Sequence, residues 1–517
     1  MSFRKESKEE SYDVIVVGSG MGGLSCAALL ARRGKKVLVV ERHDRPGGYT
    51  HSFQRGKRHF DAAIHMTGGC AQGAMGGGGL IDELLRRLNV RDECNFIPLE
   101  KLYTAVYPDM RFDAPIGIPE FVYAHADLFP SEEKGFREFV RLAVKLNRER
   151  TALDEDADAL QVDAERFPNL AKYHGATLES VLTDYVSDPR ARALFTSLWP
   201  FQGLPPSQLA VIQFTPMLSS FLSTGVHYCE GTFQRISNAF VKALEADGGE
   251  LLLRTGVRRI TVKDGSVKGV VLDHGQRIAA PVVVSNADAM QTFEELIGTE
   301  HLPADFVQYL RGLRPSVSAV NAYLGTDLDL ANHPTADHHM FFFDSWDPDT
   351  VYEGMREGRP SHLTISIPTL VDPTLAPDGE HLICVVMLAP YEVATSWRTE
   401  KGLYQEALLR QLEVLLPGLG DHLTFAEGAS PRTMERYTLN QLGALYGWEP
   451  TPENTGVGRL GHRTPIDGLM LSGHWTKPGG GLVPVTVSGV QTAQLVLGDP
   501  GVRHLLESLG SLTPAAT

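Results

Sequence analysis

The stretch that decides the fold runs from Tyr12 to Glu41 and reads YDVIVVGSGMGGLSCAALLARRGKKVLVVE. Its first six residues, YDVIVV, are rich in β-branched side chains and predict a buried strand. Residues 22–33 predict a helix, and Gly34 stands where many helices end in a left-handed residue. Residues 36–41 (KVLVVE) predict a second strand. This order forms one βαβ unit, which indicates a parallel sheet and an α/β fold.

The turn between the first strand and the helix carries the pattern GxGxxG in Gly18, Gly20 and Gly23. This pattern indicates dinucleotide binding when it lies between a strand and a helix and an acidic residue follows about 20 positions later. Glu41 is that acidic residue. Gly18 permits the tight turn, Gly20 lets backbone N–H groups approach a pyrophosphate, and Gly23 lets the helix pack close to the sheet. The helix N-terminus stabilises phosphate charge, and Glu41 can accept hydrogen bonds from ribose hydroxyls. These residues predict a bound dinucleotide.

The segment Arg45-Pro46-Gly47-Gly48 follows Glu41 closely. Arg45 suits a phosphate, although an ordinary surface arginine is the alternative. The glycine pair lets backbone run along an elongated cofactor, which a plain NAD dehydrogenase does not need. The sequence shows no second strand–GxGxxG–helix unit, which argues against a separate nicotinamide domain. FAD is therefore favoured over NAD.

The charge balance is acidic, with 48 Lys and Arg against 63 Asp and Glu and a net charge of −15. Such a chain repels phosphate backbones, so no nucleic-acid partner is expected. The five cysteines form no CxxC pair, which is typical of a reducing compartment without a disulfide framework. The sequence shows neither an apolar signal segment nor a membrane-spanning run, so a cytoplasmic location is expected. Peripheral contact with the inner face of the membrane stays a possibility, because a local apolar or basic patch is enough for it.

The rest of the chain has weaker signals. Residues 233–246 predict a helix, and a three-stranded meander follows, with Asp264-Gly265 as the hairpin turn between its first two strands. Residues 290–430 mix strand-like and helical runs and predict a second, α+β region. The acidic residues 152–165 predict a solvated helix face. Residues 68–79 are glycine-rich and predict a loop.

Three segments, in this order, resemble the FAD-dependent phytoene desaturases, carotenoid isomerases and retinol saturases, within the wider flavin amine oxidase superfamily. They are VIVVGSGMGGLSCAALLARRGKKVLVVERHDRPGGYTHSF, then GVRRI with VVVSNADA, and finally RTPIDGLMLSGHWTKPGGGLVPVTVSG. The resemblance implies an α/β fold with a Rossmann-like FAD-binding domain of the GR2 type and an inserted α+β substrate domain. The implied FAD-binding domain is discontinuous and comprises residues 11–75, 225–290 and 435–500. The implied substrate-binding domain comprises residues 76–224 and 291–434.

The resemblance also implies which residues contact the cofactor. The glycine turn and Glu41 would hold the ADP half, Val257 would meet the adenine through its backbone, and Gly473 would lie beneath the ribityl chain. The residues expected to contact FAD are Gly18, Gly20, Gly22, Gly23, Glu41, Arg42, Arg45, Gly47, Gly48, Val257, Gly473, Gly480, Gly481 and Leu482.

Near the C-terminus, the segment SGHWTKPGGGLVP links a strand-like run to a helix predicted over residues 484–497. Pro484 suits the first position of a helix, where a missing N–H costs nothing. The N-terminus of this helix is expected to point at the N1/O2 edge of the flavin, where the reduced ring carries negative charge. The glycines let backbone reach the ring, and Ser488 and Gly489 are small enough for close helix packing.

Flavin chemistry on a hydrocarbon needs positioning more than polar catalytic groups. His65, His474 and Lys477 are the candidates for moving a proton or bonding to the flavin, and a structural or surface role is the alternative for each. No metal is expected, because no cluster has the spacing of metal ligands.

Two other groups have competing interpretations. His333, His338 and His339 are interpreted as loop residues rather than as a metal site. The aromatic residues 341–343 and Trp346 fit a polyene tunnel or a membrane-facing mouth, although such residues more often belong to a core.

The sequence thus predicts an FAD-dependent enzyme that acts on carbon–carbon bonds of a long apolar polyene or isoprenoid substrate. Isomerisation, desaturation and saturation all fit. One alternative is a flavin amine oxidase acting on a C–N bond, and another is a non-catalytic flavin-containing escort protein for lipids or prenyl groups.

Overall fold

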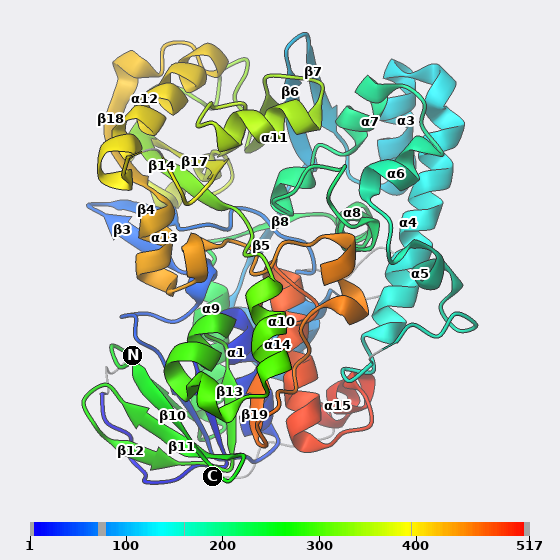
Figure 1. Cartoon of the computed structure of the whole chain (residues 1–517). Helices are drawn as coiled ribbons and strands as arrows, with labels where there is room; N and C mark the ends of the chain where they lie inside the picture. The colour runs from blue at the N-terminus through cyan, green and yellow to red at the C-terminus, as the bar shows by residue number, and fades with distance from the viewer. Residues whose placement is uncertain (1–4, 71–78, 160, 394, 511–517) are drawn as a thin grey trace.

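A five-stranded parallel sheet forms the lower part of the molecule in Figure 1. The computed structural model describes residues 5–70, 79–159, 161–393 and 395–510, so most of the glycine-rich loop at 68–79 lies outside the described residues. Helix α1 (Met21–Arg32) connects the first two strands, and Gly34 follows it with φ of +77°, which confirms the predicted βαβ unit. The strands in spatial order are β19 (Leu469–Leu471), β13 (Val282–Ser285), β1 (Val14–Val17), β2 (Val37–Val40) and β9 (Glu250–Leu252).

These strands are continuous apolar runs because both faces of the sheet are covered. Val14 and Val16 point to the face covered by α1, α9 (Gln234–Ala246) and α14 (Leu482–Leu497). Ile15 and Val17 point to the other face, which packs against a meander. The predicted hairpin turn at Asp264 and Gly265 is confirmed, since both have positive φ. The meander contains β10 (Val257–Lys263), β11 (Ser266–Leu272) and β12 (Arg277–Ala279).

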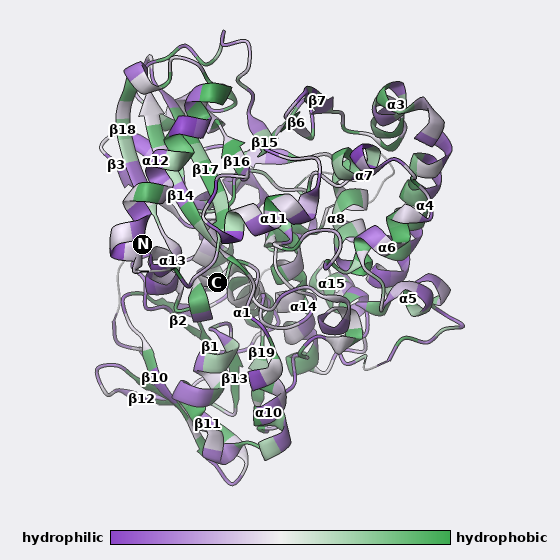
Figure 2. Ribbon diagram, turned by 45° about the horizontal axis from the view of Figure 1, so that its top comes forward, coloured by the Kyte–Doolittle hydropathy of each residue, from purple (hydrophilic) through white to green (hydrophobic). Residues whose placement is uncertain are grey.

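A seven-stranded sheet occupies the upper part of the molecule, and helix α12 (Trp397–Leu415) covers one of its faces (Figure 1). The β15–β6 pair is parallel and the other pairs are antiparallel. Figure 2 shows hydrophobic residues along β14 and β17, as expected for strands between two packed layers. The strands in spatial order are β18 (Leu423–Ala429), β14 (Ser318–Thr326), β17 (His381–Ala389), β16 (His362–Ser366), β15 (His339–Phe343), β6 (Tyr103–Tyr107) and β7 (Met110–Ala114).

A group of helices lies opposite α12, and its longest members are α3 (Ile118–Leu128), α4 (Glu133–Leu153) and α8 (Val211–Thr224). Among the described residues, no helix has both the length and the apolar composition needed to cross a bilayer. The other helices are α2 (Leu80–Arg87), α5 (Pro168–Tyr173), α6 (Leu178–Thr183), α7 (Pro189–Phe195), α10 (Ala304–Gly312), α11 (Pro348–Arg356), α13 (Pro431–Thr438) and α15 (Val502–Leu509). The other strands are β3 (Ser52–Arg55), β4 (Arg58–Asp61), β5 (Phe96–Pro98) and β8 (His227–Cys229).

The acidic stretch at 152–165 is not the helix that the sequence predicts. Helix α4 ends at Leu153, and the described residues that follow form turns and bends. Asp156 Oδ1 accepts the backbone N–H of residue 158 at 3.1 Å, and Asp163 Oδ1 accepts that of residue 165 at 2.9 Å. Such local bonds compete with helical hydrogen bonding, which explains why the prediction was wrong.

Strand β15 corrects one interpretation and decides between the two alternatives of another. His339 is its first residue and His338 precedes it, and both side chains are buried, so the loop interpretation was wrong for His339. Phe341 and Phe343 belong to one hydrophobic cluster and Phe342 to another, which is the core role that the sequence left as the alternative. Trp346 stacks on Tyr107 with ring centroids 4.1 Å apart.

Helices α1 and α14 lie side by side (Figure 1) and approach closely, as Ser488 and Gly489 predict. A Cβ atom on Gly489 would lie 1.9 Å from Ser25 Oγ and 2.4 Å from the Gly22 carbonyl oxygen. The Ser25 hydroxyl donates to the Met21 carbonyl within α1 at 2.7 Å, so it stays at this crossing. Contact at backbone distance therefore requires glycine at position 489.

We predict that Gly489→Ala lowers the free energy of unfolding by about 1–3 kcal/mol, because the methyl group overpacks the crossing. The matched control is Gly402→Ala in α12, where an added Cβ meets nothing within 4 Å. This control should raise stability by about 0.5–1 kcal/mol through helix propensity. Urea unfolding followed by circular dichroism measures both. Equal free energies of unfolding for the two variants would contradict the close packing of α1 against α14 at Gly489.

Candidate functional site

The candidate site lies at the carboxyl edge of the five-stranded sheet. Strand β1 lies in the middle of the sheet. The chain continues from β1 to its neighbour β2, and the later strand β13 pairs with the opposite edge of β1. The strand order therefore reverses at β1, and open α/β sheets bind ligands at such switch points. Gly18, Glu41, Asn286 and Gly473 follow the ends of β1, β2, β13 and β19, and all four line one cavity.

This cavity has a volume of about 1090 Å³ and extends from the sheet edge to the seven-stranded sheet and α8. Pockets for a single drug-sized ligand usually occupy about 300–1,000 Å³. Asn321 and Val386 line it on the seven-stranded sheet, and Pro216 and Phe221 line it on α8. The space therefore reaches well beyond the glycine turn.

Glu41 is held beside the glycine turn. Its Oε2 accepts hydrogen bonds from the Ser19 N–H at 2.8 Å and from the Ser19 hydroxyl at 2.7 Å. Its Oε1 accepts the His43 N–H at 2.7 Å. These bonds fix the carboxylate at the cavity wall, where it can also accept hydrogen bonds from a ligand's hydroxyl groups.

Three backbone segments meet around Asn286. A Cβ on Gly20 would lie 2.7 Å from Asn286 Nδ2, and a Cβ on Gly473 would lie 2.5 Å from Asn286 Oδ1. A Cβ on Gly22 would lie 2.7 Å from the Gly473 nitrogen. Glycine is therefore required at position 22, which meets backbone, and at position 473, which has φ of +97°, whereas a Cβ on Gly20 would displace the Asn286 side chain. Sequence reasoning assigned no role to Asn286, although the motif VVVSNADA contains it.

The loop at Gly47-Gly48 runs beside the glycine turn, since Gly47 N–H donates to the Ser19 carbonyl at 2.9 Å. Both glycines have positive φ, +124° and +58°. The Arg45 guanidinium lies at the cavity wall and donates to the Ser52 carbonyl at 2.5 Å. This backbone-rich wall is suited to an elongated anionic ligand.

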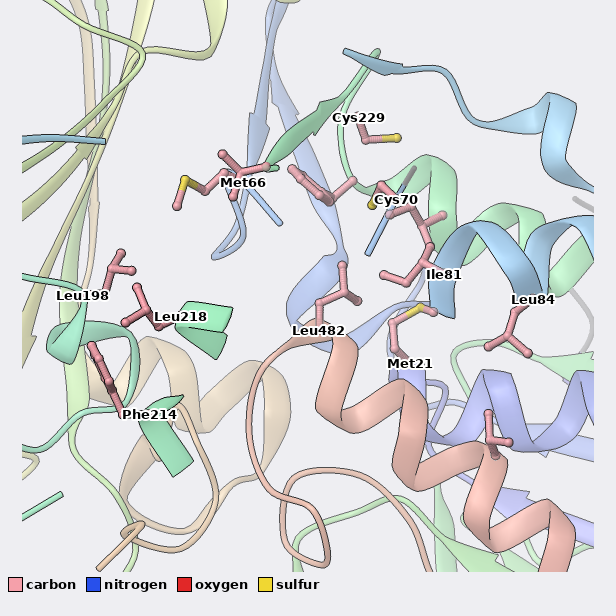
Figure 3. Packing of buried hydrophobic residues seen from close by; sticks show 14 of the residues in the cluster. Met21, Met66, Cys70, Ile81, Leu84, Leu198, Phe214, Leu218, Cys229 and Leu482 are labelled. Atoms are coloured by element: carbon pink, nitrogen blue, oxygen red, sulfur yellow. The ribbon is translucent and has the colours of Figure 1, made fainter. Parts of the chain in front are cut away.

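Helix α14 begins at the cavity, but at Leu482 rather than at Pro484. Gly481, with φ of +107°, precedes it, and Pro484 occupies the third helical position. Proline fits there as well, because the first turn of a helix has no internal partner for its N–H groups. Leu482 lines the cavity and belongs to the same hydrophobic cluster as Met21 and Ile81, which Figure 3 shows near the start of α14.

The loop before α14 is held by a buried cation to which sequence reasoning assigned no role. Arg459 is 3% exposed, and its guanidinium donates to the carbonyls of His474 at 2.5 Å and Thr476 at 3.0 Å. Burial lowers the pKa of Arg459 to about 9, so the group stays charged at neutral pH. No carboxylate forms a salt bridge with it within the described part of the chain. Backbone carbonyl dipoles compensate this charge.

The three candidate catalytic side chains do not meet. His65 and His474 line the cavity, and burial lowers the pKa of each to about 3, so both rings are neutral at pH 7. Lys477 lies outside the cavity lining, and its ammonium donates to the Ala159 carbonyl at 2.6 Å. The structure therefore brings two of the three to the cavity.

The predicted cofactor residues gather around the same space. Gly23 packs beneath it, because a Cβ there would lie 2.3 Å from the Gly18 carbonyl oxygen. Their individual contacts with a cofactor remain predictions. The predicted residues that line the cavity are Gly18, Gly20, Gly22, Glu41, Arg42, Arg45, Gly47, Gly48, Val257, Gly473, Gly480, Gly481 and Leu482.

A Rossmann-like sheet, a glycine turn beside a carboxylate and a second helix N-terminus at the same cavity define a dinucleotide-dependent oxidoreductase. The family of flavin-containing amine oxidoreductases matches residues 21–497, and the chain belongs to this family. Its cofactor is FAD, as the sequence predicts, and the backbone cradle at the glycines fits that group.

Three similar proteins cover most of the chain. Prolycopene isomerase 1, chloroplastic, from an Oncidium hybrid cultivar is 28% identical over 96% of this chain and 86% of its own length. The neurosporene-forming phytoene desaturase of Rhodobacter capsulatus is 28% identical over 93% of each chain. The all-trans-retinol 13,14-reductase of Danio rerio is 25% identical over 90% of this chain and 82% of its own. The resemblance stated from the sequence is confirmed.

A solved structure shows the same fold. The oxidoreductase from Methanosarcina mazei superposes with a TM-score of 0.62 at 18% identity, covering 93% of this chain and 99% of that one. This likeness supports the predicted α/β fold class with a Rossmann-like FAD domain.

We predict that Glu41→Gln raises the dissociation constant for FAD by about tenfold or more. The reason is that glutamine offers a single acceptor oxygen and no charge, whereas charged acceptors add about 1.5–3 kcal/mol per hydrogen bond. Titration of apoprotein with FAD, followed by quenching of flavin fluorescence, measures the constant. The control is Glu245→Gln on the exposed face of α9, which removes the same charge and should leave affinity unchanged. Equal affinity of the two variants would remove Glu41 from the cofactor site.

Proposed function

We propose that this protein is an FAD-dependent enzyme acting on carbon–carbon bonds of a long apolar polyene or isoprenoid substrate. The observation that carries the proposal is a single cavity that continues from the dinucleotide edge to a largely apolar wall. That wall includes Phe201, Met217 and Phe221 on one side and Val386 and Leu388 on the other. An elongated hydrocarbon matches a wall of this kind.

The names of the three relatives describe isomerisation, desaturation and reduction, and they support the same substrate class. The wall formed by α8 and the seven-stranded sheet also favours a hydrocarbon over an amine. Its described lining residues include no carboxylate, and the carboxylates of the cavity, such as Asp154 and Glu155, lie on other elements.

FAD supplies electron transfer to and from the substrate. The chain supplies orientation and exclusion of water. We propose that His65 and His474 touch the substrate or the flavin as neutral rings, because both line the cavity with strongly lowered pKa values. Arg459 is a positioning residue, since it holds the carbonyls of the loop before α14.

We also propose the division of the chain given by the sequence. Residues 11–75, 225–290 and 435–500 would form the FAD-binding domain, and residues 76–224 and 291–434 the substrate-binding domain. The two sheets support this division. All five strands of the parallel sheet fall in the first set, and all seven strands of the larger sheet fall in the second.

The test uses holoenzyme with chemically reduced flavin, incubated anaerobically with a poly-cis carotenoid and analysed by chromatography with mass detection. Unchanged mass with a shifted retention time would mean isomerisation. Gain of two hydrogens would mean saturation. The same substrate with oxidised enzyme and an added electron acceptor tests desaturation, which removes two hydrogens.

The control is the same protein from which the flavin has been removed, and it should leave the carotenoid unchanged. Two results contradict the proposal. Peroxide release with amines and no change in any polyene would indicate an amine oxidase. Tight binding of a prenylated partner without turnover would indicate an escort protein.

A cytoplasmic location with peripheral contact at the inner face of the membrane is part of this proposal. The five cysteines are buried and free, as a reducing compartment allows. A long apolar substrate dissolves in lipid rather than in water, so the enzyme would meet it at a membrane surface. We expect the protein to co-sediment with vesicles of neutral lipid that contain carotenoid, through apolar contact. Absence of co-sedimentation would end the membrane part of the proposal.

A further inference from the structure

A second part of the cavity runs along α14 toward α15. Val483, Val487 and Val490 all line it, and their spacing of four and three residues places them on one face of the helix. This face differs from the one at Gly489, which packs against α1. At 1.5 Å per residue, the stripe of valines extends for about 10 Å along the helix axis.

Two short helices complete this part of the cavity. Leu80 lines it from the start of α2, and Val502 and Leu506 line it from α15. Figure 3 shows Ile81 and Leu84 on the same helix α2, which packs against α14. We call the space lined by Leu80, Val483, Val487, Val490, Val502 and Leu506 the helix arm of the cavity. We call the space lined by Phe201, Met217, Phe221, Val386 and Leu388 the sheet arm.

The far end of the helix arm is charged. Glu83 and Arg87 line the cavity there from α2, and Arg503 and Glu507 line it from α15. Arg503 and Glu507 are exposed to solvent. The apolar walls therefore lead from the start of α14 to a polar rim at the surface of the protein.

Hydrogen bonds hold the walls of the helix arm in place. The Arg87 guanidinium donates to the Glu83 carboxylate at 2.7 Å and to the Leu506 carbonyl at 2.5 Å, which links α2 to α15. The Arg503 N–H donates to Glu155 Oε2 at 2.7 Å, which links α15 to the chain after α4. The helix arm is thus a channel with fixed walls.

The cofactor does not account for the helix arm. None of its six residues is among those predicted to contact FAD, of which Leu482 is the nearest in the sequence. The phosphates and ribose of FAD need polar partners, and these six side chains carry no polar atom. Val487 is only partly buried, so its side chain faces open space in the cavity. An apolar chain is the ligand that matches such walls.

We infer that the helix arm is a second subsite for the apolar chain of the substrate, so that a long polyene occupies both arms of the cavity. This inference rests on the proposed function. Val487 lies midway along the stripe, and it therefore determines how long a chain the enzyme accepts.

The experiment measures dissociation constants of the holoenzyme for two polyene hydrocarbons, one of them half as long as the other. Quenching of tryptophan fluorescence at one fixed detergent concentration reports binding. Each variant is compared with the original protein for the same polyene, so that the partition of the polyene into micelles cancels.

We expect Val487→Phe to weaken binding of the long polyene about tenfold or more, because overpacking an apolar contact costs about that factor. The short polyene should stay within about twofold of its original value, since the sheet arm alone accommodates it. Leu80→Trp narrows the helix arm from the facing helix and should give the same pattern. The matched control is Val414→Phe on α12, where the side chain is 72% exposed and lies outside the cavity lining. It should change neither constant.

Unchanged binding of the long polyene by both Val487→Phe and Leu80→Trp would overturn this inference and leave the proposed function standing. Equal weakening of both polyenes would also overturn it, because the helix arm would then not be a separate subsite. Binding of neither polyene by the original protein would overturn the proposed function and this inference together.

Discussion

The close approach of three backbone segments around Asn286 is the constraint on which the site depends. Gly22 at the start of α1 and Gly473 after β19 come from opposite ends of the chain, and a Cβ on Gly22 would lie 2.7 Å from the Gly473 nitrogen. Because neither residue has a side chain, the start of α1 and the chain that leads into α14 lie in direct contact. The N-termini of both helices line the same cavity. Their dipoles then act on one ligand, which suits an anionic dinucleotide.

The two ends of the cavity are built by different means. At the dinucleotide edge, recognition comes from backbone, glycine and one carboxylate, so it appears as a short motif in the sequence. At the other end, side chains from β15, β16, β17 and α8 form the wall. Helix α8 lies far from these three strands in the sequence, and the two parts of the wall become neighbours only in the assembled fold. This explains why the cofactor could be inferred from the sequence and the wall could not.

Local patterns predicted the elements that depend on local interactions. Gly34 after α1 and Asp264-Gly265 in the hairpin are positions where positive φ is required, and the structure has it there. The predictions were wrong where another interaction competed. Carboxylates of Asp156 and Asp163 bond to nearby backbone instead of lining a helix, and helix α14 begins at Leu482. The contacts of Asn286 with the segments around Gly20, Gly22 and Gly473 become apparent only in the assembled fold.

Electrostatics in the cavity differ from those of the whole chain. The net charge of −15 would disfavour an anionic cofactor if it acted uniformly. Near the loop before α14, however, Arg459 is a buried cation that donates to backbone carbonyls instead of pairing with a carboxylate. These carbonyl dipoles stabilise the charge without neutralising it, and buried charges are screened far less than surface ones. The N-termini of α1 and α14 add partial positive charge at the cavity itself, which favours the negative charge of FAD although the whole chain is acidic.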